Sequence, residues 1–386
     1  MVSSTKNLIF SRAAIARLLI GWGAVLGLAI AAPLLEPPIP GFLLITFLGL
    51  IIAVILVCSF GVVHEAEHLA RRLGDPYGSL VLTLSIVLIE VVLISAILLG
   101  PGEHATIARD SVMAVSMIIL NAVVGLALLV GGLKHGYLAH NRTGTSSYMA
   151  MIIVLASLAF ALPALIGVNG SYTVGQAVPI IVLTLSVYAF FLAQQMGKQA
   201  VVFREVDPRF LLNSETGPNS EITTERQPID EILREHRTEV LLRLGLLVVT
   251  VLPIVLLSHN MAALLDDGLS RLGAPVALSG VLIAMIVFLP ESITTVRAAL
   301  GGEGQRVTNL CHGAAVSTVG LTIPAVLLIG MLTNQPIILA ESRANLLLLG
   351  VTLLLSVATF SAKKVTAMHG ATHLVLFAVY GLVIFS

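Results

Sequence analysis

Two short stretches of the chain contain residues that could bind a metal or a cation. The first is "HEAEH" at residues 64–68, where His64 and His68 are four positions apart and would share one face of a helix. This spacing fits the H-E-x-x-H pattern of zinc proteases, in which two histidines bind zinc and the glutamate, here Glu65, acts as general base on a zinc-bound water. An intramembrane zinc metalloprotease is therefore one hypothesis for the function.

The second feature is a pair of acidic residues, Glu90 and Glu291, each near the middle of a long apolar segment. A carboxylate at mid-membrane is costly unless it is protonated, paired or solvated, and such residues mark ion paths. No Lys or Arg lies deep in an apolar segment, so cations and protons are the available counter-charges. Burial raises the pKa of a carboxylate and a bound cation lowers it, so cation and proton compete for the same oxygens. The pair therefore indicates exchange chemistry.

Additional oxygen ligands would be needed around these acids, since calcium takes about six to eight. Pro290 precedes Glu291, and a proline inside a helix cannot bond to the carbonyl four residues earlier, here that of Ile286. The candidate side chains on the same or neighbouring segments are Thr83, Ser85, Asn121, Ser292, Ser317 and Thr318. The arrangement implies no organic cofactor, because its ligands are inorganic cations and protons.

The composition places both features in a membrane. Hydrophobic residues make up 57% of the chain and charged residues 11%, whereas about 25% of a soluble globule is charged. Apolar segments long enough to cross a hydrocarbon core of about 30 Å recur along the chain, and in lipid such segments must be helices. We predict an all-α polytopic membrane protein in contact with the lipid bilayer. Nothing suggests nucleic-acid binding, and Cys58 and Cys311 lie in apolar segments, which argues against a disulfide framework.

Punctuation by charged residues, Pro and Gly predicts eleven transmembrane helices. They run near residues 13–35, 42–63, 77–99, 111–133, 148–168, 176–196, 240–261, 274–300, 307–332, 344–362 and 369–385. With the N-terminus inside, 18 of the 21 Lys and Arg fall on the inner side, as the positive-inside rule requires. The N-terminus and the hydrophilic 197–238 loop are therefore predicted to be cytoplasmic.

A repeat relates the two halves of the chain. "RLGDP" at residues 72–76 recurs 199 positions later as "RLGAP" at residues 271–275, and Glu67 then aligns with Asp266. An odd number of helices separates the copies, which predicts an inverted-topology repeat of the kind found in secondary transporters. The predicted divisions are an extra N-terminal helix at 1–38, a first five-helix repeat at 39–196, a cytoplasmic linker at 197–238 and a second five-helix repeat at 239–386.

The repeat bears on the protease hypothesis. A zinc protease of the membrane would pair its histidines with a later Asp, for which Asp266 or Asp267 is the candidate. The predicted topology places Asp266 on the opposite side of the bilayer from "HEAEH", so the two could not share a zinc ion. The histidines would instead belong to the charged cytoplasmic end of a repeat helix.

The chain resembles the cation/calcium exchanger superfamily, and most closely its bacterial ChaA-type calcium(sodium)/proton antiporters. The resemblance rests on "HEAEHLARRLGDPYGSLVLTLSIVLIEV" and "LPESITTVRAALGGEGQRVTNLCHGAAVSTVGLTIPAV". It implies that Glu90 and Glu291 bind cation and proton alternately, in the inner (plasma) membrane of a bacterium. Many relatives have a G-N-x-x-E motif, but here Ile86-Val87 and Val287-Phe288 precede the acids, so the family's ligating Asn is missing.

These observations predict a secondary transporter and not an enzyme. We expect a cation/proton antiporter that exports Ca²⁺ and/or Na⁺, with K⁺ as a further candidate, by alternating access driven by proton entry. Loss of the two Asn ligands favours Na⁺ or K⁺ over strict calcium selectivity. The sequence leaves open the preferred cation, the stoichiometry and the oligomeric state.

Overall fold

The computed structural model agrees with the predicted membrane class. It describes residues 11–35, 38–73, 84–85, 87–91, 94–95, 98, 105–206, 237–275 and 277–385. Within these residues ten helices are long and apolar enough to cross a membrane, in agreement with ten of the eleven predicted spans. The third predicted span, residues 77–99, is only partly described, and every described residue in it is helical.

The chain forms two compact units that do not follow the order of the sequence. Unit 1 contains Met1–Gly100 and Thr224–Pro290, and unit 2 contains Pro101–Thr223 and Glu291–Ser386. Each unit therefore combines parts of both predicted repeats. The boundary falls between Pro290 and Glu291, inside the helix α13 (Ala277–Gly301).

Helices α2 (Arg12–Ala31), α3 (Gly41–Leu73) and α12 (Arg237–Arg271) pack together in unit 1, and the short η1 (Ala32–Leu35) follows α2. They meet closely at Gly21 of α2, where an added Cβ would lie 2.9 Å from Cys58 Sγ and 3.1 Å from Pro253 Cβ. A larger residue there would push α2 away from both neighbours. Trp22 also ties α2 to α12, because its Nε1 donates to the carbonyl of Val249 at 3.3 Å.

Helices α3 and α12 are both longer than a bilayer requires, and they run antiparallel. Glu65, near the end of α3, pairs with Arg243 near the start of α12. At the other end, a Cβ on Gly268 would lie 3.3 Å from Leu44. The α3 helix continues ten residues past its predicted end at Val63, so "HEAEH" forms part of the helix itself.

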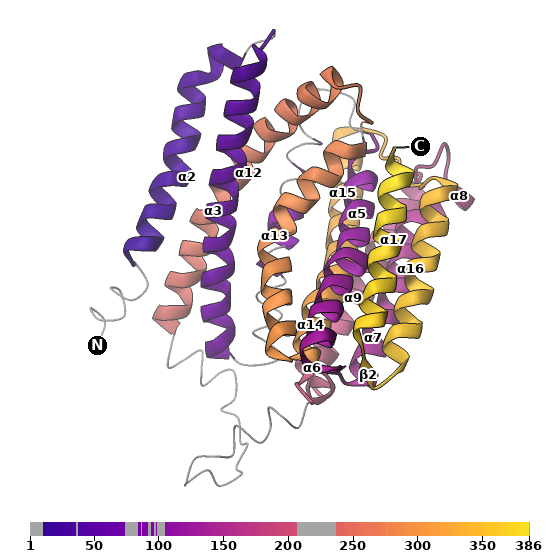
Figure 1. The fold of residues 1–386 in the computed structure, drawn as a ribbon. Coiled ribbons are helices and arrows are strands. Elements are labelled where there is room, and N and C mark those ends of the chain that lie inside the picture. Colours follow the sequence, from indigo (N-terminus) through magenta and orange to yellow (C-terminus); the bar gives the residue numbers. More distant parts are fainter. Residues whose placement is uncertain are drawn as a thin grey trace. The chain divides into compact units, whose positions relative to one another are not determined.

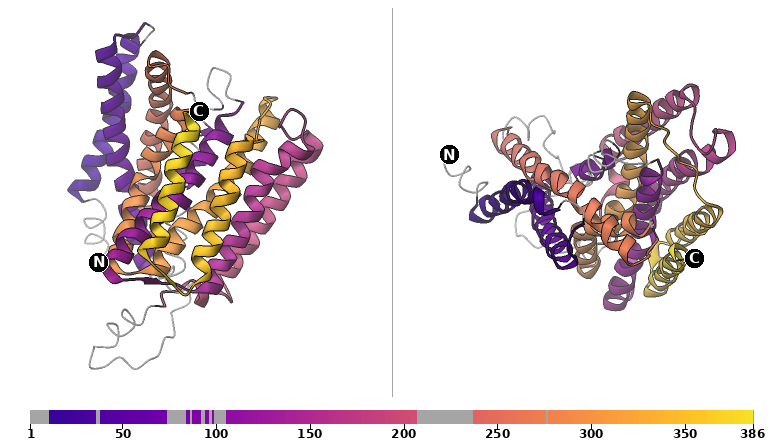
Figure 2. Two further views of the ribbon diagram at one scale, coloured as in Figure 1. Left: turned by 45° about the vertical axis from the view of Figure 1, so that its right-hand side comes forward. Right: turned by 90° about the horizontal axis from the view of Figure 1, so that it is seen from above.

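Unit 2 is a bundle of membrane helices, several of them interrupted (Figures 1 and 2). Its elements are α5 (Ile107–Met117), η2 (Ile118–Val123), α6 (Val124–His135), β1 (Leu138–Ala139), α7 (Arg142–Ala156), η3 (Ser157–Ala161), α8 (Leu162–Ile166), α9 (Val174–Met196), η4 (Ala200–Phe203), α14 (Gly304–Ser317), η6 (Thr318–Thr322), α15 (Ile323–Thr333), α16 (Arg343–Ser361), β2 (Lys364–Val365) and α17 (Ala367–Ile384). The α5–η2–α6 span is central, since 83% of its most apolar part is buried. The α16 and α17 helices lie side by side (Figure 2).

In the described residues, three π-helical turns interrupt spans that the sequence predicted as plain helices. They are η2, η3 and η6, and η6 begins 200 residues after η2. The η2 and η6 turns thus occupy matching places in the two predicted repeats. A π-turn changes which backbone and side-chain groups face a neighbour, and such turns are frequent at functional sites.

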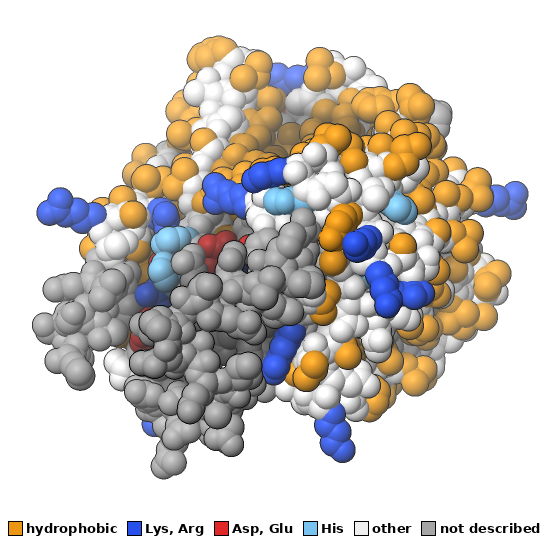
Figure 3. All heavy atoms as spheres, turned by 60° about the horizontal axis from the view of Figure 1, so that its bottom comes forward, with side chains coloured by type: hydrophobic (Ala, Val, Ile, Leu, Met, Phe, Trp, Pro, Cys, Tyr) orange, Lys and Arg blue, Asp and Glu red, His pale blue; other side chains and the backbone are white. Residues whose placement is uncertain are grey.

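A short antiparallel pairing, absent from the sequence prediction, joins two helix connections of unit 2. Leu138 of β1 pairs with Val365 of β2, and Ala139 pairs with Lys364. Figure 3 looks onto this end of the molecule, where many Lys and Arg side chains are visible. Their presence at this end is compatible with the side predicted to be cytoplasmic.

Candidate functional site

The two acidic residues predicted from the sequence are both buried. Glu90 is 3% exposed within the described helical residues 87–91, and Glu291 is 4% exposed on α13. They belong to different compact units. In an apolar span a buried carboxylate must be neutralised by a proton, a partner or a bound cation.

In unit 1, the predicted additional cation ligands differ in how far they are buried. Ser85 is buried at 8% exposure, five residues before Glu90. Thr83 lies outside the described residues. Pro290 is buried inside α13 and Ile286 is half-buried on the same helix. Since Pro290 has no N–H, the Ile286 carbonyl loses its usual helical donor beside the point where the chain passes into unit 2.

In unit 2, Glu291 has two neighbours that the sequence prediction missed. Thr295 is fully buried and follows Glu291 by one helical turn. Cys311 of α14 is also buried, and its thiol lies near Glu291 and Thr295, although Thr295 Oγ1 has no hydrogen-bond partner among the described residues. The i, i+4 spacing of "ESITT" was the available sequence signal for Thr295, whereas Cys311 is brought close only by packing. Ser292, the predicted neighbour, is half-buried.

Asn121 is the predicted additional ligand whose side-chain oxygen is available to a cation. It is fully buried in η2, and its Nδ2 donates to Thr352 Oγ1 at 2.9 Å and to Met117 Sδ at 3.7 Å. Its Oδ1 has no hydrogen-bond partner among the described residues. An amide oxygen held in this way is the type of ligand that a hard cation uses.

Ser317 and Thr318 are adjacent in the chain, at the junction of α14 and η6, and both are buried. The Tyr188 hydroxyl of α9 donates to Ser317 Oγ at 3.0 Å. The Tyr188 ring fits against η6 because residue 320 is glycine, whose added Cβ would lie 3.0 Å from the ring. The structure therefore gives Ser317 a packing role between α9 and η6.

Buried histidines form a feature of unit 2 that the sequence prediction did not include. His312 of α14 and His373 of α17 are fully buried, and His140 is 4% exposed. The rings of His140 and His312 both pack edge-on against Phe360, with centroids 5.3 Å and 4.6 Å away. His373 Nε2 lies 3.2 Å from Thr359 Oγ1. Burial lowers the pKa of His140, which lies outside the membrane spans, below its ordinary value of 6.5.

One face of α16 continues this polar group towards Asn121. Thr352, Ser356 and Thr359 recur at helical spacing and are at most 1% exposed. Thr352 contacts Asn121, Thr359 contacts His373, and Ser356 Oγ has no partner within the described part of the chain. Buried hydroxyls in a helix otherwise apolar are costly unless they are bonded. These three residues of α16 therefore make part of the interior of unit 2 polar.

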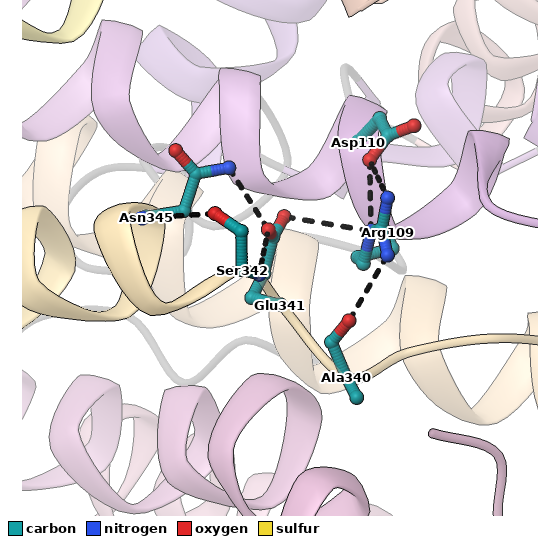
Figure 4. A network of polar contacts seen from close by, with 6 residues as sticks. All are labelled: Arg109, Asp110, Ala340, Glu341, Ser342 and Asn345. Atoms are coloured by element: carbon teal, nitrogen blue, oxygen red, sulfur yellow. Dashed lines mark hydrogen bonds and ion pairs between the residues drawn. The ribbon is translucent and has the colours of Figure 1, made fainter. Parts of the chain in front are cut away.

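Another buried acid lies at the opposite end of unit 2, in the network drawn in Figure 4. Glu341 Oε2 accepts from the Ser342 backbone at 3.0 Å and from Asn345 Nδ2 at 2.9 Å, and its Oε1 lies 3.8 Å from Arg109 Nε. Arg109 also binds Asp110 and donates to the Ala340 carbonyl at 3.0 Å. Burial raises the pKa of Glu341 above its ordinary value of 4.5, against the opposing effects of Asn345 and Arg109.

The zinc protease hypothesis is not supported by the geometry of unit 1. The Glu65 carboxylate, its intended general base, accepts a hydrogen bond from Arg243, which also pairs with Glu239 at 3.2 Å. Asp266 lies 23 residues beyond Arg243 on α12, which is about 35 Å at 1.5 Å per residue. Asp266 therefore cannot join His64 and His68 at one metal, and in the described ranges no three His, Cys, Asp or Glu residues form a metal-binding group.

Comparison with known proteins finds that the chain is similar to ion exchangers and ion transporters. The family model described as sodium/calcium exchanger protein matches residues 43–197 and 242–386. The chain is 30% identical to the sodium-potassium/proton antiporter ChaA of Escherichia coli (strain K12) over 333 residues, which cover 86% of this chain and 87% of that protein. It is 32% identical to the putative ionic transporter y4hA of Sinorhizobium fredii (strain NBRC 101917 / NGR234) over 324 residues, covering 83% of each.

Among solved structures, the H⁺/Ca²⁺ exchanger CAX is similar with a TM-score of 0.66 and 16% identity, over 96% of this chain and 88% of that one. At this identity the likeness shows the fold. It confirms the predicted class, an all-α membrane protein of about eleven helices with two inverted five-helix repeats and an extra N-terminal helix. The exact limits of the repeats, 39–196 and 239–386, stay a prediction.

Proposed function

Because the chain belongs to the sodium/calcium exchanger protein family, we propose that it is an antiporter that exports Na⁺, K⁺ or Ca²⁺ in exchange for protons. Membership makes it an integral membrane ion exchanger and not an enzyme. The choice of cation, the use of protons and the direction of transport are the proposed parts. The membrane is proposed to be a bacterial inner membrane, with the N-terminus and the 197–238 loop in the cytoplasm.

The observation that carries the proposal is the burial of one acidic residue in each half of the family match. Glu90 lies within the matched residues 43–197, and Glu291 lies within 242–386. A buried carboxylate prefers to be protonated, while a cation at its oxygens favours the ionised form. Each acid can therefore hold either a proton or part of a cation's ligand shell, and the two occupants exclude each other.

Exchange follows if the acids face the two sides of the membrane in turn. When they face the cytoplasm, they release protons and bind a cation. When they face outside, protons displace the cation and return the acids to the neutral state. A proline inside a helix is where the helix bends most readily, and Pro290 precedes Glu291 at the boundary of the two compact units.

The ligand set favours monovalent cations, with Ca²⁺ also transported. No Asn precedes Glu90 or Glu291 at the position where many relatives have one. Asn121 is the proposed amide ligand, because its Oδ1 has no partner in the described residues. A shell with few fixed oxygens is completed by water and discriminates weakly by coordination number. The name of the 30%-identical relative, a sodium-potassium/proton antiporter, supports the same choice.

The test is to reconstitute the purified protein in liposomes with an acidic interior and to follow internal pH with an entrapped dye. We expect external Na⁺, K⁺ or Ca²⁺ to raise internal pH, while choline, a bulky organic cation, does not. If no cation dissipates the gradient, proton coupling is wrong. If calcium uptake instead follows a sodium gradient at clamped pH, the protein is a sodium/calcium exchanger.

A further inference from the structure

A pocket of about 1130 Å³ lies in unit 2, at the end predicted to face the cytoplasm. Its walls come from β1 and the connection before α7, from α7 itself, from the end of α16 with the residues that lead into β2, and from Val206. All of these segments belong to one compact unit. None of the described residues that line it is among the proposed cation ligands Glu90, Asn121 and Glu291.

The pocket is strongly positive. Arg142, Lys363 and Lys364 line it, and no Asp or Glu is among its lining residues in the described part of the chain. Lys364 Nζ lies 3.9 Å above the centre of the Tyr137 ring, and none of the three cations has an ion pair within the described ranges. Unpaired positive charge around a concavity attracts an anion.

The start of α7 adds to this field. Arg142 is its first residue, and the helix macrodipole places partial positive charge there. The Asn141 side chain already accepts from the N–H groups of Thr143 and Gly144 at 3.0 Å and 3.4 Å, so those groups are occupied. The helix end therefore contributes its field, and the ligand contacts must come from side chains.

A buried polar side chain in the pocket wall has an unused hydrogen-bonding atom. His140 is 4% exposed and lines the pocket. Its Nε2 lies 3.2 Å from the Phe360 carbonyl oxygen and so acts as the donor, while its Nδ1 has no partner among the described residues. The unpartnered Nδ1 can accept from a protonated phosphate, or donate to an ionised one once the ring is charged.

Towards the membrane interior the pocket becomes apolar. Met149 and Ile153 of α7 and Val357 of α16 line this part, and Ile153 and Val357 are 39% and 43% exposed. Ile153 is 11 residues along α7 from Arg142, about 16 Å at 1.5 Å per residue. The pocket thus combines a cationic mouth at the membrane surface with an apolar wall along two membrane helices.

We propose that this pocket binds an anionic phospholipid, with its phosphate at Arg142, Lys363 and Lys364 and an acyl chain along α7 and α16. Basic pockets between transmembrane helices on the cytoplasmic side suit such headgroups. The exposed Lys and Arg on this face bring anionic lipid close (Figure 3). A free phosphate ion would match the cations but would leave the apolar wall without a role.

The test compares lipid retention by purified full-length protein, measured by native mass spectrometry with phosphatidylglycerol and phosphatidylcholine as probes. The pocket variant is Arg142→Gln/Lys363→Gln/Lys364→Gln. The matched control, Lys134→Gln/Lys198→Gln/Arg306→Gln, removes three positive charges that do not line the pocket. We expect phosphatidylglycerol retention to fall at least tenfold in the pocket variant and to stay within twofold of wild type in the control.

A second variant, Ile153→Trp, separates lipid from free anion and keeps every charge. This variant should lower phosphatidylglycerol retention at least threefold. Millimolar inorganic phosphate should not displace phosphatidylglycerol from the protein. Equal retention in the pocket variant and its control overturns the site. Full competition by inorganic phosphate shows an anion site without lipid, and tighter retention after neutralising the seven acidic residues of 207–236 shows that this segment is the occupant. Either result also overturns the proposal.

Discussion

Two groups of buried polar side chains, one in each compact unit, differ in whether their hydrogen-bonding atoms all have partners. The group in unit 1 is complete in this sense, and the group in unit 2 is incomplete. In unit 1, Arg243 bonds to both Glu65 and Glu239, so the charges of α3 and α12 are matched within the protein. In unit 2, Asn121 Oδ1 and Ser356 Oγ have no partner among the described residues. A completed group stabilises the packing of helices, whereas an incomplete one costs stability and keeps ligands available. We infer that the first group serves the fold and the second serves transport.

The largest effect should come from the two buried acids, Glu90 and Glu291. Glu291→Gln or Glu90→Gln keeps the shape of the side chain but cannot trade a proton for a cation, so we expect transport in proteoliposomes to be abolished. Folding should be preserved, because the amide carries no charge into the buried site. The control His64→Ala/His68→Ala should transport at nearly the wild-type rate. Wild-type transport in either glutamine variant would remove that residue from the mechanism.

Breaking the completed group should act on stability instead. Arg243→Met leaves Glu65 and Glu239 buried without their counter-charge, a change that typically costs about 3–5 kcal/mol. Thermal unfolding in detergent should show a large loss, with transport per folded molecule unchanged. Arg271→Met breaks only an exposed pair on the same helix and should cost less than about 1 kcal/mol. Equal losses of unfolding stability in the two variants would contradict the structural role of the completed group.

The incomplete group should respond in its affinity for cations. Asn121→Ala removes the free Oδ1, and we expect the apparent affinity to weaken about tenfold, as loss of one contact of about 1.4 kcal/mol would produce. Thr352→Val removes the partner of Asn121 Nδ2 but keeps the oxygen, so affinity should change by less than about threefold, under 1 kcal/mol. The measurement is the cation dependence of proton flux. A stronger effect from Thr352→Val would indicate that Asn121 only positions α16.

The smallest effect concerns pH and the Glu341 network. Burial raises the pKa of Glu341 above 4.5, so the folded protein holds this proton more tightly than the unfolded chain. Stability from this group is therefore full below pH 4.5 and falls as pH rises through the higher folded pKa. Glu341→Gln should flatten the unfolding temperature over that range, and Arg109→Gln should steepen its decline, because the guanidinium favours the ionised acid. An unchanged pH profile in both variants would exclude Glu341 as its source.

Much of the fold could be predicted because membrane spans leave a strong local signal. Ten of the predicted spans are helices in the structure. A segment of about 20 apolar residues has few other conformations in lipid, because its backbone groups must bond to one another. The π-turns at Ile118–Val123 and Thr318–Thr322 were not predicted, because their residues fit a regular α-helix equally well. The β1–β2 pairing was also missed, since two-residue strands depend on a partner more than 200 residues away.

The sequence by itself determined the class of this protein and its two acids. Apolar length, the loop charges and the "RLGDP" and "RLGAP" copies are all readable without coordinates, and so is a carboxylate in an apolar span. Only the tertiary structure decided which polar residues are completed by partners. It paired Glu65 with Arg243, 178 positions apart, left Asn121 Oδ1 open, and buried His140 beside Phe360. The physical reason is that burial and hydrogen bonding depend on neighbours in space, and helix packing brings together residues whose local sequences contain no trace of one another.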